Sequence, residues 1–284
     1  MASKRNLFFC LLLSFFLAAC GGGGSSSNDS GNGGNGDNGG NDGGGTVTKK
    51  LLSRFVANGQ ERERFRYDHL NRLVEMDSPG LGLRRFEYEG DDARPSLLLE
   101  PYPNLGYMYS RYQYGTDDLN GVPTNYFQTQ SLNANQVPFS MIWRYYLNAH
   151  DRIIAMGTAV NDVFSPRANT YAYDDRGNLL KLTTAVGATW EYTYDDKKSP
   201  ASETATPRWL FDDMSVGFLA NPNNPLSEVY AFYPSRTYRT YRYTYDSDGY
   251  PDEVSVTSEV FNEATGVTIN LGTEVLSFEY IPAH

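Results

Sequence analysis

The chain has 284 residues, of which 40% are hydrophobic and 14% aromatic, and its formal net charge is −10. Because basic clusters are absent from the sequence, nucleic acid and direct binding to anionic lipid are poor candidates as partners. Only three histidines and two cysteines are present, which leaves few side chains for metal or thiol chemistry.

Residues 1–19 have the pattern of a secretory signal peptide. Lys4 and Arg5 precede an apolar run from Leu7 to Ala19, which is too short for a spanning helix. The run ends in Leu-Ala-Ala-Cys at Cys20 and resembles the lipobox of bacterial lipoproteins. This resemblance implies that Cys20 is lipidated, becomes the first mature residue and holds the protein to a membrane. The alternative is an ordinary cleaved signal with an incidental cysteine.

Residues 20–45 form the expected lipidated cysteine and tether. Gly21–Gly45 contains almost only Gly, Ser, Asn and Asp, so it cannot bury enough apolar surface to offset its ordering entropy. We expect a disordered linker with a root-mean-square reach of about 25–30 Å. Gly21 directly after the cysteine resembles lipoproteins of the Gram-negative outer membrane, which implies that location and leaves the periplasmic and surface-facing leaflets open. Cys10 would be lost with the signal, so the mature chain has no disulfide.

Residues 46–284 have a uniform composition and predict one all-β domain. Aromatic residues recur two positions apart with mostly polar residues between them, which indicates half-buried strands with one aromatic and one solvated face. The aromatic groups are Phe65/Tyr67, Phe86/Tyr88, Tyr112/Tyr114, Trp143/Tyr145, Tyr171/Tyr173, Trp190/Tyr192/Tyr194, Tyr241/Tyr243/Tyr245 and Phe278/Tyr280.

Tight turns follow most of these aromatic groups. In Tyr171–Thr184, Asp174 can accept a backbone N–H two residues on, and Gly177 suits a left-handed position. A type I turn closed by a glycine bulge joins two antiparallel strands in this way. The same spacing separates Asp68 from Asn71, Asn148 from Asp151 and Asp246 from Gly249.

These segments resemble the YD repeat of bacterial Rhs-type proteins. The matching stretches are Tyr67–Leu73, Tyr173–Leu179 and Tyr245–Gly249. Tyr192–Ser199 and Tyr243–Pro251 also resemble uncharacterised exported lipoproteins that carry such repeats. The resemblance implies an antiparallel sheet of linked hairpins with no assigned activity.

Two segments interrupt the hairpins. Glu100–Gly106 contains two prolines and predicts a loop, and Ser199–Ser235 is a long proline-rich insertion. Its apolar piece, Trp209–Leu219, could form one short helix or plug across the sheet. An aromatic face of this extent must be covered, so we expect a curved antiparallel sheet, open or barrel-like.

Catalytic motifs are absent from the sequence, which disfavours a serine or zinc hydrolase. Asp246, Asp248 and Asp252 are closely spaced carboxylates, as in a calcium-binding loop, but turn capping already accounts for Asp246. We therefore predict no metal and no other cofactor.

The tyrosines allow a second interpretation, because tyrosine and tryptophan rings can stack on sugars. Most follow the strand period and are expected on the inner face of the sheet. Those off the period are the candidate ligand-binding residues: Trp209, Tyr233, Tyr107, Tyr109 and Tyr102, together with Tyr250 just past a turn. Asp212 and Asp213 would be the acids of a glycan-processing site if they faced another carboxylate across a cleft.

The sequence thus predicts a lipid-anchored protein of the outer membrane with a non-enzymatic binding or structural role. The alternative is a glycan-binding or glycan-processing envelope protein that uses the aromatic and acidic insertion. Expected partners are the membrane, through the lipid, and a glycan or an envelope protein.

Overall fold

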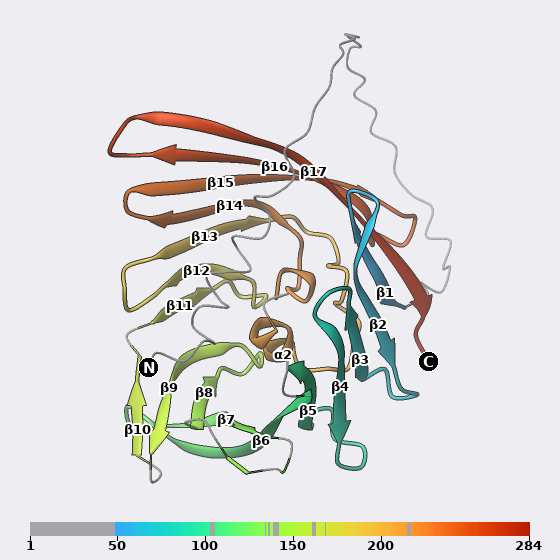
Figure 1. Ribbon diagram of the computed structural model, residues 1–284, viewed down its shortest axis with the longest axis vertical. Coiled ribbons are helices and arrows are strands. Elements are labelled where there is room, and N and C mark those ends of the chain that lie inside the picture. The colour runs from blue at the N-terminus through green and yellow to red at the C-terminus, as the bar shows by residue number, and fades with distance from the viewer. Residues whose placement is uncertain are drawn as a thin grey trace. The chain divides into compact units, whose positions relative to one another are not determined.

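The computed structural model describes residues 49–102, 106–133, 135, 137–138, 142–160, 163–167, 169–214 and 217–284. They lie within one compact unit, Thr48–His284. The predicted signal peptide, Cys20 and the tether lie outside the described residues. The described chain is almost entirely antiparallel sheet, which confirms the predicted fold class (Figure 1).

The described chain consists of consecutive strands with two short helical segments between β13 and β14. They are β1 Lys50–Ala57, β2 Gln60–Tyr67, β3 Leu73–Ser78, β4 Gly82–Tyr88, β5 Pro95–Tyr102, β6 Gly106–Leu119, β7 Val122–Leu132, β8 Ile142–Leu147, β9 Ile153–Val160, β10 Val163–Pro166, β11 Thr170–Tyr173, β12 Leu179–Thr183, β13 Thr189–Tyr194, α2 Arg208–Asp213, η2 Gly217–Leu219, β14 Pro225–Phe232, β15 Ser235–Tyr245, β16 Pro251–Asn262 and β17 Val267–Pro282.

The strands form one sheet of 17 strands. Neighbours in sequence pair antiparallel from β1 to β10 and from β11 to β17. The last strand returns to the first, with Phe278 of β17 opposite Phe55 of β1. Among the described residues no ladder joins β10 to β11, so the sheet is strongly curved but open there (Figure 1).

The turns have the geometry that the sequence predicted. Asp174 Oδ1 accepts the backbone N–H groups of Arg176 (3.0 Å) and Asn178 (2.8 Å). Gly177 has a φ of 88°, and the register shifts at Ala172/Tyr173, as expected of a bulge. The equivalent residues Asn71, Asp151 and Gly249 also have positive φ. Each turn therefore holds its strands through one side-chain oxygen and one left-handed residue.

At several turns the tyrosine that ends the preceding strand links neighbouring hairpins. The hydroxyl of Tyr88 donates to the carbonyl oxygen of Leu73 (2.6 Å), and that of Tyr194 donates to Leu179 (2.8 Å). Tyr173 of β11 reaches Ile153 of β9 (2.6 Å) and so bridges the open seam of the sheet. Such bonds contribute about 0.5–1.5 kcal/mol each, and they explain why tyrosine rather than phenylalanine occupies these positions.

The long insertion interrupts one of these turns, the one that begins at Asp195. Asp195 Oδ1 accepts the N–H of Lys197 (3.0 Å), as in the other turns, but its next partner is the N–H of Asn224 (3.0 Å). The residues between Lys197 and Asn224 therefore leave and re-enter the turn. Leu226 and Val229, which were expected inside the insertion, belong to β14 instead. This strand begins at Pro225, and a proline is tolerated there because the first residue of a strand can lack a backbone N–H donor.

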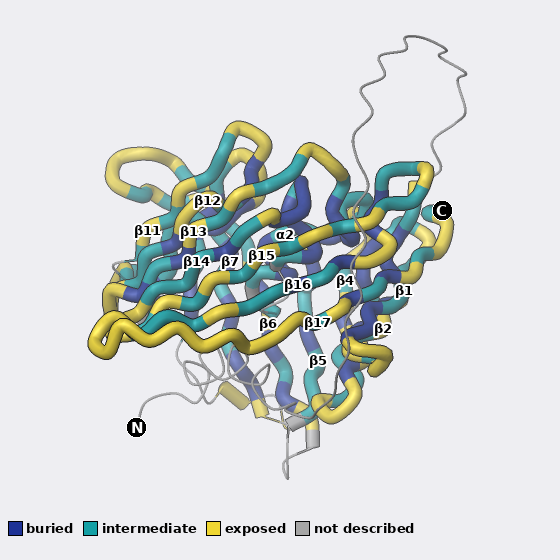
Figure 2. Tube along the Cα trace, turned by 90° about the horizontal axis from the view of Figure 1, so that it is seen from above, coloured by how far each residue is buried: buried dark blue, intermediate teal, exposed yellow. Residues whose placement is uncertain are grey.

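The insertion fills the inside of the curved sheet. The predicted short helix is present as α2, and its Trp209, Leu210 and Phe211 are fully buried, as is Leu219 of η2. These side chains join the inward aromatic residues of the strands in one core. In Figure 2 the chain trace at α2 has the dark blue of buried residues. Phe55 stacks on Phe278 at 5.7 Å between ring centroids, within the same core. Most of the on-period tyrosines also pack against this core, which confirms that they belong to the inner face.

The predicted loop Glu100–Gly106 is shorter than expected. β5 continues through Pro101 to Tyr102, and β6 begins at Gly106. Pro101 lies opposite Tyr107, and a proline is tolerated where its missing donor removes no ladder bond.

Candidate functional site

Trp209 has a structural position rather than an exposed one. Its ring is stacked on Phe127 at a centroid distance of 3.9 Å and lies 5.4 Å from Tyr112. The side chain is 0% exposed, so no face of the indole is free for a ligand. The groove that the sequence suggested around Trp209 is occupied by the core.

Asp212 is paired with a cation. Its carboxylate lies 3.3 Å from Arg152, which is only 1% exposed and also donates to Asn221 Oδ1 (3.0 Å). No basic partner of Asp212 was expected from the sequence. The missed signal was Arg152 itself, which occupies the same turn position as Arg72, the partner of Asp68. The side chain of Asp213 lies outside the described part of the chain.

The other predicted ligand residues are not brought together. Tyr107 of β6 is 45% exposed and Tyr233, in the turn between β14 and β15, is 74% exposed. Tyr109 is half-buried on β6, and Tyr250 is fully buried beside Tyr280. β6 and β14 are several strands apart in either direction around the sheet. The side chain of Tyr102 lies outside the described residues.

The acidic turn considered for calcium binds a lysine. Lys50 Nζ lies 2.6 Å from Asp246 and 2.7 Å from Asp248, and these carboxylates raise its pKa. An ammonium group thus neutralises the oxygens that a cation would need. In the part of the chain that the structure describes, no cluster of three or more His, Cys, Asp or Glu side chains could hold a metal ion.

A polar hollow exists on a different face, where β6 is longer than its neighbour β5. Leu97 of β5 lies opposite Arg111, whereas β6 continues to Leu119. The resulting groove has a volume of about 480 Å³ and lies between the turn after β4 and the strands β6 and β7. Its lining residues are Glu89, Asp92, Arg94, Ser96, Tyr112, Gln113, Tyr114, Tyr126 and Gln128.

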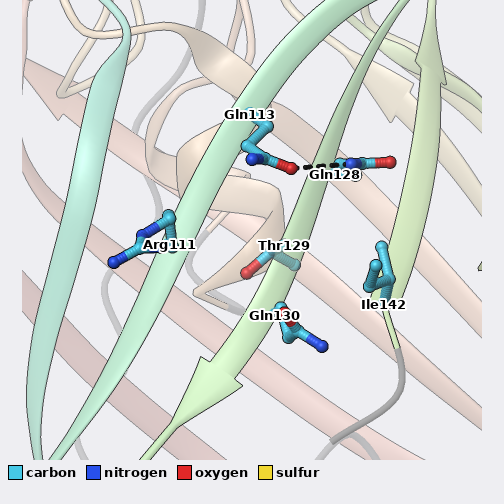
Figure 3. A pocket seen from close by; sticks show the side chains of 6 residues that line it. All are labelled: Arg111, Gln113, Gln128, Thr129, Gln130 and Ile142. Carbon is cyan, nitrogen blue, oxygen red and sulfur yellow. Dashed lines mark hydrogen bonds between the residues drawn. The ribbon is translucent and has the colours of Figure 1, made fainter. Parts of the chain in front are cut away.

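A second, smaller hollow of about 50 Å³ shares Gln113 and Gln128 with it. Figure 3 shows these two amides joined across β6 and β7, with Arg111 and Gln130 on the same pair of strands and Ile142 on β8. We call the two hollows together the Gln113–Gln128 groove.

Hydrogen bonds fix the orientation of both amides. Arg144 is a pure donor and binds Gln128 Oε1 (3.1 Å from Nη2), so Gln128 Nε2 points the other way and donates to Gln113 Oε1 (2.8 Å). The amide nitrogen of Gln113 is then directed away from this pair. Arg144 is held by Asp117 (2.8 Å) and is only 3% exposed. A buried charge at one end therefore polarises a short chain of amides that ends at the surface.

Tyr126 lies flat on the sheet because Gly115, opposite it on β6, has no side chain. A Cβ at Gly115 would lie 2.7 Å from Cζ and from the hydroxyl oxygen of Tyr126. On Tyr126 the guanidinium of Arg144 stacks 4.4 Å from the ring centroid. These two contacts fix the position of the Tyr126 ring at the edge of the groove.

From the sequence, Gln113 and Arg144 were expected only on the solvated face of the strands. A signal was available in the residue types, which are all glutamine or arginine. The positions that face one another on β6, β7 and β8 include Arg111, Gln113, Gln128, Gln130 and Arg144. Of these long side chains, Arg144 bonds to Gln128 and Gln128 bonds to Gln113 across the strands, which shorter residues could not do.

Comparison with known proteins gives one family match. Residues 173–197 match the family described as RHS Repeat, which confirms the repeat predicted there. No curated protein matches the chain. Among the described residues no helix has the length and apolar character needed to cross a membrane.

Several solved structures are similar at 12% identity. A porin-like protein from Bacteroides vulgatus ATCC 8482 has a TM-score of 0.38, with 82% of this chain and 100% of that chain covered. A porin-like protein from Bacteroides uniformis ATCC 8492 has a TM-score of 0.33, with 81% and 96% covered. A TcdB2-TccC3-TEV structure has a TM-score of 0.23, with 74% of this chain and 11% of that chain covered.

Proposed function

We propose that this chain is a lipid-anchored protein of the outer membrane that acts, without catalysis, as a binding or structural component of the cell envelope. The observation that carries the proposal is the filled interior of the sheet. Trp209 is 0% exposed, and Asp212 is paired with Arg152. A glycosidase needs two carboxylates at a defined separation in an open cleft, whereas the described part of the insertion fills the core with Trp209, Leu210 and Phe211.

The anchor rests on the sequence around Cys20, which is followed by the Gly-, Ser- and Asn-rich segment Gly21–Gly45 shortly before β1. A tether of this composition lets the folded unit stand clear of a membrane surface. The RHS repeat at 173–197 supports an extracytoplasmic scaffold, in keeping with the resemblance of these hairpins to exported repeat proteins.

The anchor is tested by fractionating cells that express the full chain. We expect the wild-type protein in the membrane fraction, released by detergent but not by high salt, and the Cys20→Ser variant in the soluble fraction. Cys10→Ser is the matched control, because Cys10 lies inside the apolar run and would be removed with the signal. Membrane retention of Cys20→Ser would contradict the lipid anchor.

The absence of catalysis is tested with the purified chain and a panel of glycosidic substrates. We expect no turnover with the wild type. Turnover that disappears in Asp212→Asn would instead support the glycan-processing alternative at the insertion.

A further inference from the structure

We propose that the Gln113–Gln128 groove binds a neutral oligosaccharide. This inference rests on the binding role within the proposed function and gives it a site and a ligand class. The larger hollow of the groove has the size of a small-ligand site, with a volume of about 480 Å³. It lies at the edge of β6 beyond the start of β5, where Gln113, Tyr126 and Gln128 line it from the outer face and Tyr112 and Tyr114 from the inner one.

The polar groups of the groove offer both donors and acceptors. Gln113 presents its amide nitrogen, Arg111 an exposed guanidinium and Glu89 an exposed carboxylate. Vicinal hydroxyl groups of a sugar need this mixture, since each hydroxyl donates once and accepts twice. Both faces of the Tyr126 ring are covered, by β6 at Gly115 and by Arg144, so Tyr126 offers the groove its ring edge and its hydroxyl, one apolar and one polar contact.

The charges favour a neutral ligand over an anionic one. Arg94 is engaged by Asp92 at 2.6 Å, and Arg144 by Asp117 at 2.8 Å, so two of the three arginines near the groove are already neutralised. Glu89 adds a negative charge at the wall. An acidic sugar would meet this carboxylate with only Arg111 to balance it.

The geometry also disfavours an extended peptide added to the edge of β6. The hydroxyl of Tyr114 donates to the carbonyl oxygen of Pro95 (2.6 Å), so its ring spans the gap between β6 and the start of β5. Arg94 covers that ring at 4.7 Å from its centroid. A further strand would need this space for its backbone, whereas a sugar can bind to the side-chain amides outside it.

The amide orientation makes the site pre-organised. Arg144, through Gln128, fixes which atom of Gln113 faces outward. A ligand then avoids the entropic cost of ordering these side chains. The loss of affinity on removal of Gln113 should therefore be larger than the loss expected for a hydrogen bond from a mobile side chain.

The test uses the detergent-solubilised full chain on an array of short neutral oligosaccharides built from hexoses and N-acetylhexosamines. Arms with uronic-acid oligosaccharides and extended peptides accompany it. We expect retention on neutral sugars, an affinity at least about tenfold lower for Gln113→Ala, and the wild-type affinity for Gln60→Ala. Gln60 is an exposed glutamine at the start of β2, outside the groove, and serves as the matched control.

A second variant removes no polar group. In Gly115→Ala the new Cβ would lie 2.7 Å from Cζ of Tyr126 and would displace the ring. We expect weakened sugar binding with an unchanged melting temperature, because the clash is with the end of a side chain. Retention by acidic sugars or peptides alone, retention that Gln113→Ala leaves unchanged, or no retention on any neutral sugar would each overturn the proposal. Fractionation of Cys20→Ser is independent of the groove, so failure of the anchor and failure of the sugar site are distinguishable.

Discussion

The two ends of the sheet are built differently. At one end, which we call the turn rim, the turns at 68–72, 148–152, 174–178 and 246–250 meet the insertion. Asn71 accepts the N–H of Ala205 (3.0 Å), Asn178 donates to Asn223 (2.9 Å), and Lys198 reaches Tyr250 (3.2 Å). The opposite end, the free rim, has short hairpin turns with exposed apolar residues such as Val186 and Tyr233, both 74% exposed.

This difference shows what the repeat contributes to the fold. Its aspartates, left-handed residues and tyrosines all lie toward the turn rim, where they join segments far apart in sequence. At the free rim the strands are joined mainly by ladder hydrogen bonds and local turns. The insertion makes the turn rim the place where the core is closed, so substitutions there should cost more stability than similar substitutions at the free rim.

The largest expected effect is the loss of the buried indole. Trp209→Ala should lower the free energy of unfolding by about 3–5 kcal/mol, because it leaves a cavity where the ring now stacks on Phe127. Tyr233→Ala, an aromatic truncation at the free rim, should change it by less than about 0.5 kcal/mol. Urea denaturation followed by tryptophan and tyrosine fluorescence measures both. A loss below about 1 kcal/mol for Trp209→Ala would show that the insertion does not close the core.

A smaller effect is expected at a single turn. The carboxylate of Asp174 accepts the backbone N–H of Asn178 (2.8 Å) and its side-chain amide (2.8 Å), and together with Arg176 these bonds lower its pKa against the opposing effect of burial. Asp174→Ala leaves these donors unsatisfied and should cost about 1–3 kcal/mol. The exposed neighbour Asp175 is the matched control.

The same denaturation curves decide this prediction. Asp175→Ala should leave the midpoint within error of the wild type, since its side chain is exposed in the turn. Equal losses in the two variants would mean that the aspartate that opens the repeat has no special structural role.

The sequence predicted the turn rim better than the groove. Asp174 and Gly177 define a turn through local chemistry, and the alternation of Tyr171 and Tyr173 defines a strand face, so both are visible in a few consecutive residues. The helix in the insertion was also predicted, from one apolar segment. The burial of Trp209 was not, because it depends on how the whole sheet curves around α2.

The Gln113–Gln128 groove is a product of long-range geometry. It exists because β6 continues beyond the start of β5 and because Gly115 lies opposite Tyr126. Neither relation can be seen before the register of the strands is known. For the same reason the pairing of Asp212 with Arg152, 60 residues apart, was missed.

The last prediction concerns a carboxyl group inside the sheet, on the half of β2 toward the free rim. Burial raises the pKa of Glu63 to about 7, against the lowering effects of the Ser78 hydroxyl, which donates to it, and of Arg84; Asp77 adds a smaller increase. In the unfolded chain its pKa returns to about 4.5. Between these two values the folded state keeps a proton that the unfolded state has lost, so this group makes stability fall as the pH rises through that window.

Glu63→Gln should remove this dependence. The variant should be more stable than the wild type at pH 8, by about 1–2 kcal/mol after allowance for the partial exposure of the carboxyl, and similar to it near pH 4.5. Urea denaturation at intervals between pH 4.5 and 8 measures the difference, with Glu253→Gln on the exposed face of β16 as the control that keeps the wild-type profile. A constant difference across this range would show that Glu63 does not titrate there. A difference that grows with pH would show that the free rim holds a buried acid at a cost to stability, whereas at the turn rim Asp174 is stabilised by the bonds it accepts.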